Sequence, residues 1–261
     1  MNKFTIIAGP CVVESKEMLQ EVASIVSPIC NELGFDYVFK ASYRKANRTS
    51  VASFTGIGDE RALEYLAEIH TEFGVPTITD IHTAEEATLA AQFVDVLQIP
   101  AFLCRQTDIL QAAGMTGKTV NIKKGQFLAP ADMAKAAAKV SATGNNSIWL
   151  TERGTTFGYH DLVVDYRGLV IMRESGYPVI YDATHSVQMP GGGEQSGGQP
   201  RFIRSLARAA VAVGIDGLFV ETHPNPQKAK SDAATQLPLS EIKNFLEEIA
   251  LIQSVITSSR T

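Results

Sequence analysis

The sequence predicts a single-domain α/β protein, a (β/α)8 barrel (TIM barrel) that spans residues 1–261. Short apolar segments with the length of buried strands alternate with amphipathic segments that carry apolar residues three and four positions apart. Eight such pairs follow one another, and short apolar strands that each precede a helix are typical of parallel βα units. About 250 residues for eight units is the usual size of this barrel.

Each element is placed by its hydrophobic period and by its end signals. Strands are expected at Thr5–Ala8, Tyr37–Lys40, Pro76–Asp80, Val94–Ile99, Thr119–Lys123, Ile148–Glu152, Val179–Asp182 and Leu218–Glu221. Helices are expected at Met18–Leu33, Asp59–Phe73, Ala84–Phe93, Asp108–Ala113, Pro130–Val140, Leu162–Glu174, Phe202–Val213 and Leu239–Ile256. Ser15 is placed to cap the first helix, and Gly34, Gly74 and Gly214 are placed to end helices.

A doubly wound open sheet is the alternative fold. Its Gly-rich dinucleotide turn is missing, because Gly9-Pro10-Cys11 does not match GxGxxG. The segment Pro190–Pro200 contains five glycines and follows the seventh predicted strand. Because loops at that end of a barrel strand border the active site, we expect this segment to be a mobile lid.

Composition limits the classes of function. The chain is 45% hydrophobic and 20% charged with a formal net charge of −5, so general nucleic-acid binding or attachment to a membrane surface is not expected. No apolar run approaches the roughly 20 residues that a transmembrane helix needs. Three cysteines without a framework spacing are typical of a reducing compartment, which predicts a cytoplasmic protein.

A basic cluster follows the second predicted strand, in the segment FKASYRKANRTS. Its cations are interleaved with hydroxyl and amide side chains, and a chain with net negative charge has no global need for them. Lysine and arginine give charge-assisted hydrogen bonds to anions, so the cluster predicts an anion site at the strand end. A solvated basic loop is the alternative. The four cations are Lys40, Arg44, Lys45 and Arg48.

Polar residues also recur at the other strand ends, where barrel enzymes carry their catalytic groups. They are Cys11, Asp80, His82, Gln98, Arg105, Lys123, Lys124, Glu152, Arg153, Asp182, His185, Glu221, His223 and Asp232, with Ala101 among them. Cations from the second, fifth and sixth strands would meet at one mouth. This pattern predicts a site for a small polyanion that carries both phosphate and carboxylate.

A metal site is a second hypothesis. Cys11, His185, Glu221 and Asp232 lie at the ends of the first, seventh and eighth strands, which are neighbours once a barrel closes. A mixed sulfur, nitrogen and oxygen set suits a divalent transition metal such as Zn, Fe, Mn or Co. The alternative is a small buried cysteine and carboxylates that cap helices or pair with arginine.

The remaining cysteines and histidines carry weaker signals. Cys30 lies within an amphipathic helix and is assigned to the core, and Cys104 lacks partners in the sequence. His70 lies near a helix end and is expected at the surface. His160 and His223 lie in predicted βα loops, where a direct role stays open.

Eight segments, in order between Ile6 and Leu239, resemble the 3-deoxy-D-manno-octulosonate 8-phosphate synthase family, also named 2-dehydro-3-deoxyphosphooctonate aldolase. They are IAGPCVVES, FKASYRKANRTS, TITDIHT, LQIPAFLCRQTD, VNIKKGQF, LTERGTTFGYHDLVVD, YDATHSVQMPGG and ETHPNPQKAKSDAATQLPL. The related 3-deoxy-arabino-heptulosonate 7-phosphate synthases usually read KPRTS where this chain reads KANRT. The Ala-Asn form indicates the octulosonate branch, and Thr49 keeps the hydroxyl of that branch's usual KANRS.

The resemblance implies a transferase that condenses phosphoenolpyruvate with D-arabinose 5-phosphate and water, in the synthesis of a lipopolysaccharide precursor. It also implies a homotetramer. The alternatives are the sister enzyme that uses erythrose 4-phosphate, a metal-dependent aldolase, or a non-catalytic phosphosugar binder on the same fold.

The resemblance also implies roles for individual residues. Phosphoenolpyruvate would be held by Lys45, Lys123 and Arg153 with Lys40, Gln98 and Ala101. The pentose phosphate would be held by Asn47, Arg48 and Thr49, by Arg105 of a neighbouring subunit, and by Asp80 and Gln188. The implied catalytic residues are Lys45, Asn47, Asp80, Lys123, His185 and Asp232. Cys11 indicates the metal-dependent branch, because the metal-free branch carries Asn there; the implied ligands are Cys11, His185, Glu221 and Asp232.

Overall fold

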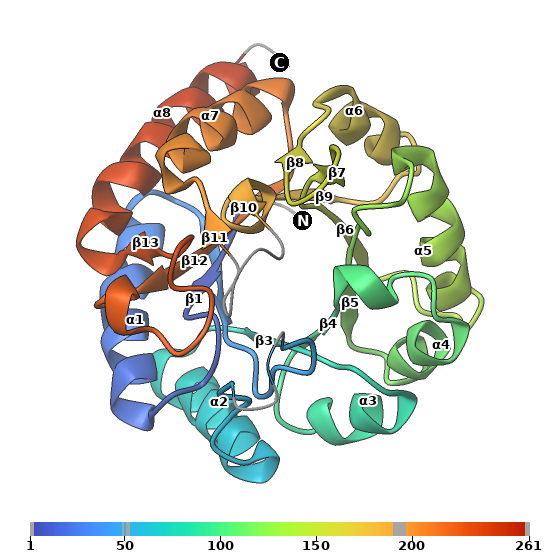
Figure 1. The fold of residues 1–261 in the computed structure, drawn as a ribbon, viewed down its shortest axis with the longest axis horizontal. Helices are drawn as coiled ribbons and strands as arrows, with labels where there is room; N and C mark the ends of the chain where they lie inside the picture. The colour runs from blue at the N-terminus through green and yellow to red at the C-terminus, as the bar shows by residue number, and fades with distance from the viewer. Residues whose placement is uncertain (1–2, 49, 51–52, 190–196, 259–261) are drawn as a thin grey trace.

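The computed structural model describes residues 3–48, 50, 53–189 and 197–258, and it has the predicted barrel (Figure 1). Eight parallel strands pair in the order β1-β2-β3-β4-β5-β6-β9-β12, and β12 pairs back with β1, which closes the sheet. These strands are β1 (Thr5–Gly9), β2 (Asp36–Lys40), β3 (Thr77–Asp80), β4 (Val96–Ile99), β5 (Thr119–Lys123), β6 (Ile148–Glu152), β9 (Val179–Asp182) and β12 (Gly217–His223).

The helices form an outer ring around the strands (Figure 1). They are α1 (Lys16–Glu32), α2 (Asp59–Phe73), α3 (Ala84–Ala90), α4 (Thr107–Met115), α5 (Met133–Ser141), α6 (Arg167–Arg173), α7 (Ile203–Val213) and α8 (Ile242–Ser258). The Ser15 hydroxyl accepts the N–H of Met18 at 3.2 Å and caps α1, as predicted. Gly74 and Gly214 end α2 and α7 in the left-handed conformation, which glycine adopts without strain.

The inside of the barrel is filled in two layers. The lower layer is an apolar cluster made of Ile7, Val38, Ile78, Val96, Ile180 and Phe219. Above it the polar side chains are joined by hydrogen bonds from strand to strand. Thr151 donates to Asn121 at 2.6 Å, Asn121 donates to Gln98 at 2.9 Å, and Gln98 donates to the Asp80 carboxylate. This polar layer satisfies its own buried groups and forms a fixed floor beneath the carboxyl ends of the strands.

The prediction of a helix over Leu162–Glu174 is wrong at its first residues. Leu162 and Val163 form β8 (Leu162–Val163), which pairs antiparallel with β7 (Thr155–Thr156), and α6 begins at Arg167. A two-residue apolar segment fits both the helical and the strand period, so the pattern alone could not separate them. The helix start is instead marked by Asp165, whose carboxylate accepts the N–H of Arg167 at 3.0 Å.

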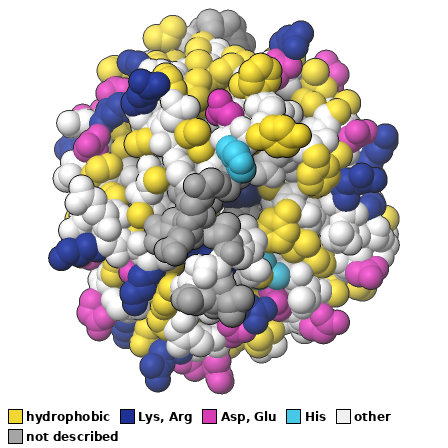
Figure 2. Space-filling model, viewed as in Figure 1, with side chains coloured by type: hydrophobic (Ala, Val, Ile, Leu, Met, Phe, Trp, Pro, Cys, Tyr) yellow, Lys and Arg dark blue, Asp and Glu magenta, His cyan; other side chains and the backbone are white. Residues whose placement is uncertain are grey.

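Three further short strands decorate the loops. β10 (Gln188–Met189) pairs antiparallel with β11 (Gly197–Gly198), and β13 (Leu237–Pro238) extends from β12. Residues 190–196 of the predicted lid lie outside the described residues. On the face shown in Figure 2, basic and acidic side chains alternate around the periphery without a large patch of one sign. Within the ranges that the structure describes, no helix is long and apolar enough to cross a membrane.

Candidate active site

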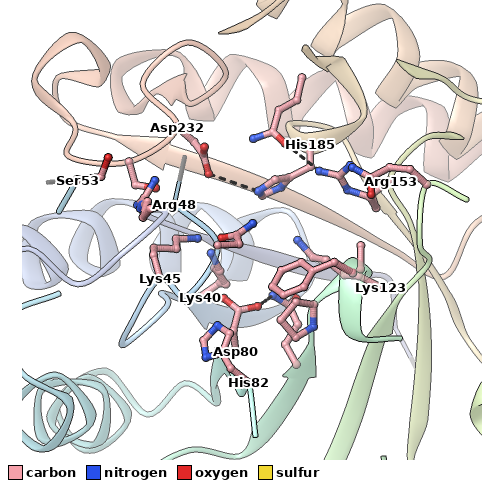
Figure 3. A pocket seen from close by; sticks show the side chains of 18 of the residues that line it. Lys40, Lys45, Arg48, Ser53, Asp80, His82, Lys123, Arg153, His185 and Asp232 are labelled. Atoms are coloured by element: carbon pink, nitrogen blue, oxygen red, sulfur yellow. Dashed lines mark hydrogen bonds and ion pairs between the residues drawn. The ribbon is translucent and has the colours of Figure 1, made fainter. Parts of the chain in front are cut away.

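A cavity of about 220 Å³ opens at the carboxyl ends of the barrel strands. Lys40, Asp80 and Lys123 are the last residues of β2, β3 and β5, so the strand ends deliver them to one place. Figure 3 shows the lysines between Asp80 on one side and Asp232 with His185 on the other. Six cations line the cavity: Lys40, Lys45, Arg48, Lys123, Arg153 and Lys230. Asn47, Gln98, Ala101 and Gln188, all predicted site residues, also line it.

Two arginines that line this cavity each have a side-chain nitrogen without a hydrogen-bond partner among the described residues. Arg153 donates through Nη2 to Gln188 at 2.8 Å, and Arg48 donates through Nε to the carbonyl of Phe54 at 3.0 Å. Arg153 Nη1 and Arg48 Nη2 are buried and have no hydrogen-bond partner among the described residues. Buried guanidinium donors are normally satisfied, so both nitrogens are suited to receive an anion inside the cavity.

The carboxylates that border the lysines are ionised. Burial alone would raise the pKa of Asp182, but His185 and Lys123 hold it well below the usual range. Lys123 Nζ donates to Asp182 at 2.7 Å and lies 3.8 Å from the centre of the Phe219 ring. Asp80 is likewise buried, and Lys40, Lys45 and Lys123 depress its pKa. The cavity wall therefore holds fixed charges of both signs, and its cations outnumber its carboxylates.

The four predicted metal ligands come together at one side of the cavity. One ligand atom each from Cys11, Glu221 and Asp232 lies within 4.8 Å of the others, and Cys11 Sγ is 3.0 Å from Asp232 Oδ2. His185 Nε2 lies 3.7 Å from Glu221 Oε1 and 3.8 Å from Asp232 Oδ2. Asp232 has a left-handed backbone with φ of 47°, an uncommon conformation that is concentrated at functional sites.

These residues fit a divalent transition metal. Glu221 Oε1 accepts a hydrogen bond from Lys40 at 2.6 Å, whereas its Oε2 is buried without a partner in the described part of the chain. Burial, together with Asp232 and Glu221, raises the pKa of the Cys11 thiol well above its ordinary value. The nearby Lys45 and His185 lower the pKa of Asp232 to about 2 against the effect of burial. The set thus offers sulfur, imidazole nitrogen and an orphaned carboxylate oxygen, and metal binding there would release the thiol proton.

Two predicted cations do not face the cavity. Arg44 pairs with Asp59 at 2.9 Å and with Glu86, so it belongs to a network behind the cavity wall. Lys124 is fully buried between the barrel and its helices, 3.4 Å from Glu152. Side chains alternate between the two faces of a strand, so Lys123 points into the barrel and the next lysine points away from it.

Other predicted residues lie apart from the cavity within this chain. Arg105 is exposed at the surface and does not line the cavity, and Thr49 lies outside the described residues. His160 is exposed with φ of 58°, and His223 is buried with Nε2 3.6 Å from Glu14. His70 lies at the surface, as its position near a helix end predicted, and its Nδ1 is 3.0 Å from Asp95 Oδ2. Cys30 and Cys104 are both buried and free.

Sequence reasoning missed several residues that line the cavity. Lys230 lies two positions before Asp232 and places its Nζ 4.6 Å from the centre of the Phe54 ring. Ser53, Phe54, Phe102 and Gln126 line the cavity as well. Lys230 could have been found from its place in the same strand-end loop as Asp232, whereas the others carry no distinctive local signal.

Comparison with known proteins identifies the family of the chain. The model of the DAHP synthetase I family matches residues 1–257. The 2-dehydro-3-deoxyphosphooctonate aldolase of Syntrophotalea carbinolica is 55% identical over 252 residues, which cover 96% of this chain and 91% of the relative. The proteins of the same name from Trichlorobacter lovleyi and Koribacter versatilis are both 53% identical, over 96% and 98% of this chain and 93% of each relative. The chain therefore belongs to the DAHP synthetase I family, and its resemblance to the 3-deoxy-D-manno-octulosonate 8-phosphate synthases is confirmed.

Proposed function

We propose that the chain condenses phosphoenolpyruvate with D-arabinose 5-phosphate and water to give 3-deoxy-D-manno-octulosonate 8-phosphate and inorganic phosphate. The relatives carry a name for this activity, and they cover nearly the whole chain. The observation that carries the proposal is that six cations line the cavity at the carboxyl ends of the barrel strands. A protein of net charge −5 has concentrated its basic side chains where two phosphorylated substrates would meet.

The charges of the substrates match this cavity. Each phosphate monoester carries about −1.5 to −2 at neutral pH, and phosphoenolpyruvate adds a carboxylate. The cations exceed the lining carboxylates Asp80 and Asp232, and Arg48 and Arg153 each bring a nitrogen without a partner among the described residues. Holding both reactants by their anionic ends supplies the proximity that a bimolecular condensation needs.

The reaction forms one carbon–carbon bond and one carbon–oxygen bond from water, and it breaks the carbon–oxygen bond to the phosphate. C3 of the enol attacks the sugar aldehyde, water adds at C2, and the phosphate leaves with its bridging oxygen. Positive charge that develops at C2 would be stabilised by the ionised carboxylates that line the cavity, Asp80 among them. Lys123 and Arg153 would hold the phosphoenolpyruvate, and Asn47 and Arg48 the sugar phosphate.

We further propose that Cys11, His185, Glu221 and Asp232 hold a divalent transition metal, Zn, Fe, Mn or Co. The support is the convergence of the three ligand atoms within 4.8 Å and the orphaned oxygen of Glu221. A metal bound there would polarise the sugar aldehyde or orient the attacking water. Lys40, which holds Glu221 Oε1, would keep that carboxylate in place.

We also propose that the protein is a homotetramer in the cytoplasm. Arg105 is exposed and apart from the cavity of its own chain, so it is available to complete the sugar-phosphate site of a neighbouring subunit in a homotetramer. The three cysteines are buried and free, which suits the reducing cytoplasm.

A phosphate-release assay with each sugar, with and without a chelator, tests the function. Asn47 lines the cavity and adds a polar group suited to a longer, hydroxyl-rich sugar. A site that hydrogen-bonds a hydroxyl discriminates strongly against an analogue that lacks it, so we expect arabinose 5-phosphate to be preferred over erythrose 4-phosphate by at least about a hundredfold. Comparable turnover of the shorter sugar would instead assign the sister activity. Release of pyruvate without phosphate would indicate an aldolase, and release of neither would indicate a binder.

A further inference from the structure

A second cluster of polar groups lies behind the cavity wall, around Glu86 in the first turn of α3. Its carboxylate is nine-tenths buried and accepts four hydrogen bonds. Tyr43 donates through its hydroxyl and Arg44 through Nη2. His82 approaches twice, with its backbone N–H at 2.8 Å and its ring Nδ1 at 3.1 Å. These four hydrogen bonds to one buried carboxylate hold Tyr43, Arg44 and His82 in place.

The groups around Glu86 keep its carboxylate ionised. Burial opposes ionisation of Glu86, but the hydrogen bonds from His82 and Tyr43 lower the pKa of Glu86 to about 2. Arg44 supplies the compensating positive charge and is held in turn by Asp59 at 2.9 Å. An ionised carboxylate can only accept hydrogen bonds, so His82 Nδ1 must carry a proton.

His82 connects this cluster to the cavity. Its ring lines the cavity next to Asp80, two residues earlier in the chain, and Figure 3 shows the two side chains close together. Nδ1 is engaged by Glu86, and Nε2 has no hydrogen bond to any residue that the structure describes. With Nδ1 protonated, Nε2 of the neutral ring is an acceptor.

We propose that Glu86 is a positioning residue that locks His82 with Nδ1 protonated, so that Nε2 accepts a hydrogen bond from a hydroxyl group of the bound sugar. The choice of ligand rests on the proposed function, because only the sugar substrate is rich in hydroxyl donors. His82 lines the cavity beside Asp80 and across from Asp232 and His185, so its ring borders the space in which both substrates would bind. Arg44 and Tyr43 serve this arrangement by holding Glu86 ionised and in place.

Nitrogen-15 NMR of the histidine rings tests the lock without any need for activity. In the wild-type protein the neutral His82 ring should be protonated at Nδ1. In Glu86→Leu no oxygen remains to accept a hydrogen bond from Nδ1, so the proton is no longer held there and should move toward Nε2. Glu85→Leu, at the exposed neighbouring position, is the control and should leave the His82 signals unchanged. A wild-type ring with bare Nδ1, or a ring that Glu86→Leu does not change, overturns the proposal.

Kinetics test whether Glu86 acts through His82. Glu86→Leu should lower kcat/KM for arabinose 5-phosphate by about tenfold to a hundredfold and leave the KM for phosphoenolpyruvate unchanged. In the His82→Asn background the same substitution should cause no further loss, whereas additive losses overturn the proposal. A wild-type protein without condensing activity refutes the proposed function alone, because the NMR result still stands. If Glu86→Leu does not fold, the wild-type ring decides the matter, since bare Nδ1 contradicts the lock and protonated Nδ1 supports it.

Discussion

Lys124 lies at a strand end but does not face the cavity, and we expect it to stabilise the fold without taking part in catalysis. It is fully buried, and its ammonium lies 3.4 Å from the buried carboxylate of Glu152. It also donates to Thr155 Oγ1 at 3.0 Å and to the carbonyl of Gly125 at 3.3 Å. Lys124→Met keeps most of the volume but removes the positive charge beside Glu152, which then keeps only the N–H groups of Arg153 and Gly154. Removing one partner of a buried ion pair costs about 3 to 5 kcal/mol, and we expect that loss in the free energy of unfolding.

The cost should depend on pH in a defined direction. Burial already raises the pKa of Glu152 above its ordinary value of 4.5, although Lys124 counteracts this effect. A carboxyl group with a raised pKa favours the folded state fully below its unfolded pKa, and the advantage is lost as pH rises through the folded pKa. Lys124→Met removes the counteracting charge and raises the folded pKa further. The destabilisation should therefore be largest near pH 8 and decrease toward pH 5.

Urea unfolding of the two proteins at pH 8 and pH 5, followed by circular dichroism, measures both effects. Lys243→Met is the matched control, because Lys243 is half-exposed and lies 3.6 Å from the exposed Glu32. A surface change of this kind should alter the free energy of unfolding by no more than about 0.5 kcal/mol. The reasoning is refuted if both variants lose the same stability, or if the loss in Lys124→Met does not decrease at low pH.

Two further predictions concern the site itself. Cys11→Asn should bind little metal, measured by mass spectrometry, yet keep activity that chelators do not affect, since an amide can hydrogen-bond where a thiolate would ligate. A wild-type protein that stays fully active after exhaustive chelation would contradict the ligand assignment. Arg105→Ala should weaken binding of the sugar phosphate by about tenfold to a hundredfold, the usual value of a charged hydrogen bond. Mixed oligomers of Arg105→Ala and Lys123→Met chains should recover some activity, and the absence of recovery would place Arg105 in its own barrel or in no site.

The fold was predictable because its signals are local and repeated. Each barrel strand is short and apolar, and the helix ends carry signals such as Ser15 and Gly74 that act within one turn. The grouping of Cys11 with His185 and Glu221 also followed from topology alone, because β9, β12 and β1 are neighbours in a closed barrel.

The orientation of single side chains was harder to predict. In β5, Asn121 and Lys123 face the barrel interior while Val120 and Ile122 join the helix-facing core. The alternation of period two continues beyond the strand, so Lys124 falls on the helix-facing side. That signal was present in the sequence and was overlooked.

Arg44 offered no such signal. It lies past the end of β2, where the backbone no longer alternates, and its partners Asp59 and Glu86 come from two separate helices. The position of Lys230 against Phe54 likewise depends on two loops about 180 residues apart in the chain. Contacts of this kind are decided by tertiary packing, and a single sequence carries no period that reveals them.

The groups without partners in the cavity indicate what completes it. Arg48 Nη2, Arg153 Nη1 and Glu221 Oε2 are buried and unpaired among the described residues, in a protein whose polar barrel layer is otherwise joined by hydrogen bonds. Each unsatisfied group costs about 1 to 3 kcal/mol, and more when it is charged. Two of them need an anion and the third needs a cation, which the proposed substrates and the proposed metal would supply. Each ligand that satisfies one of these groups should stabilise the barrel by mass action.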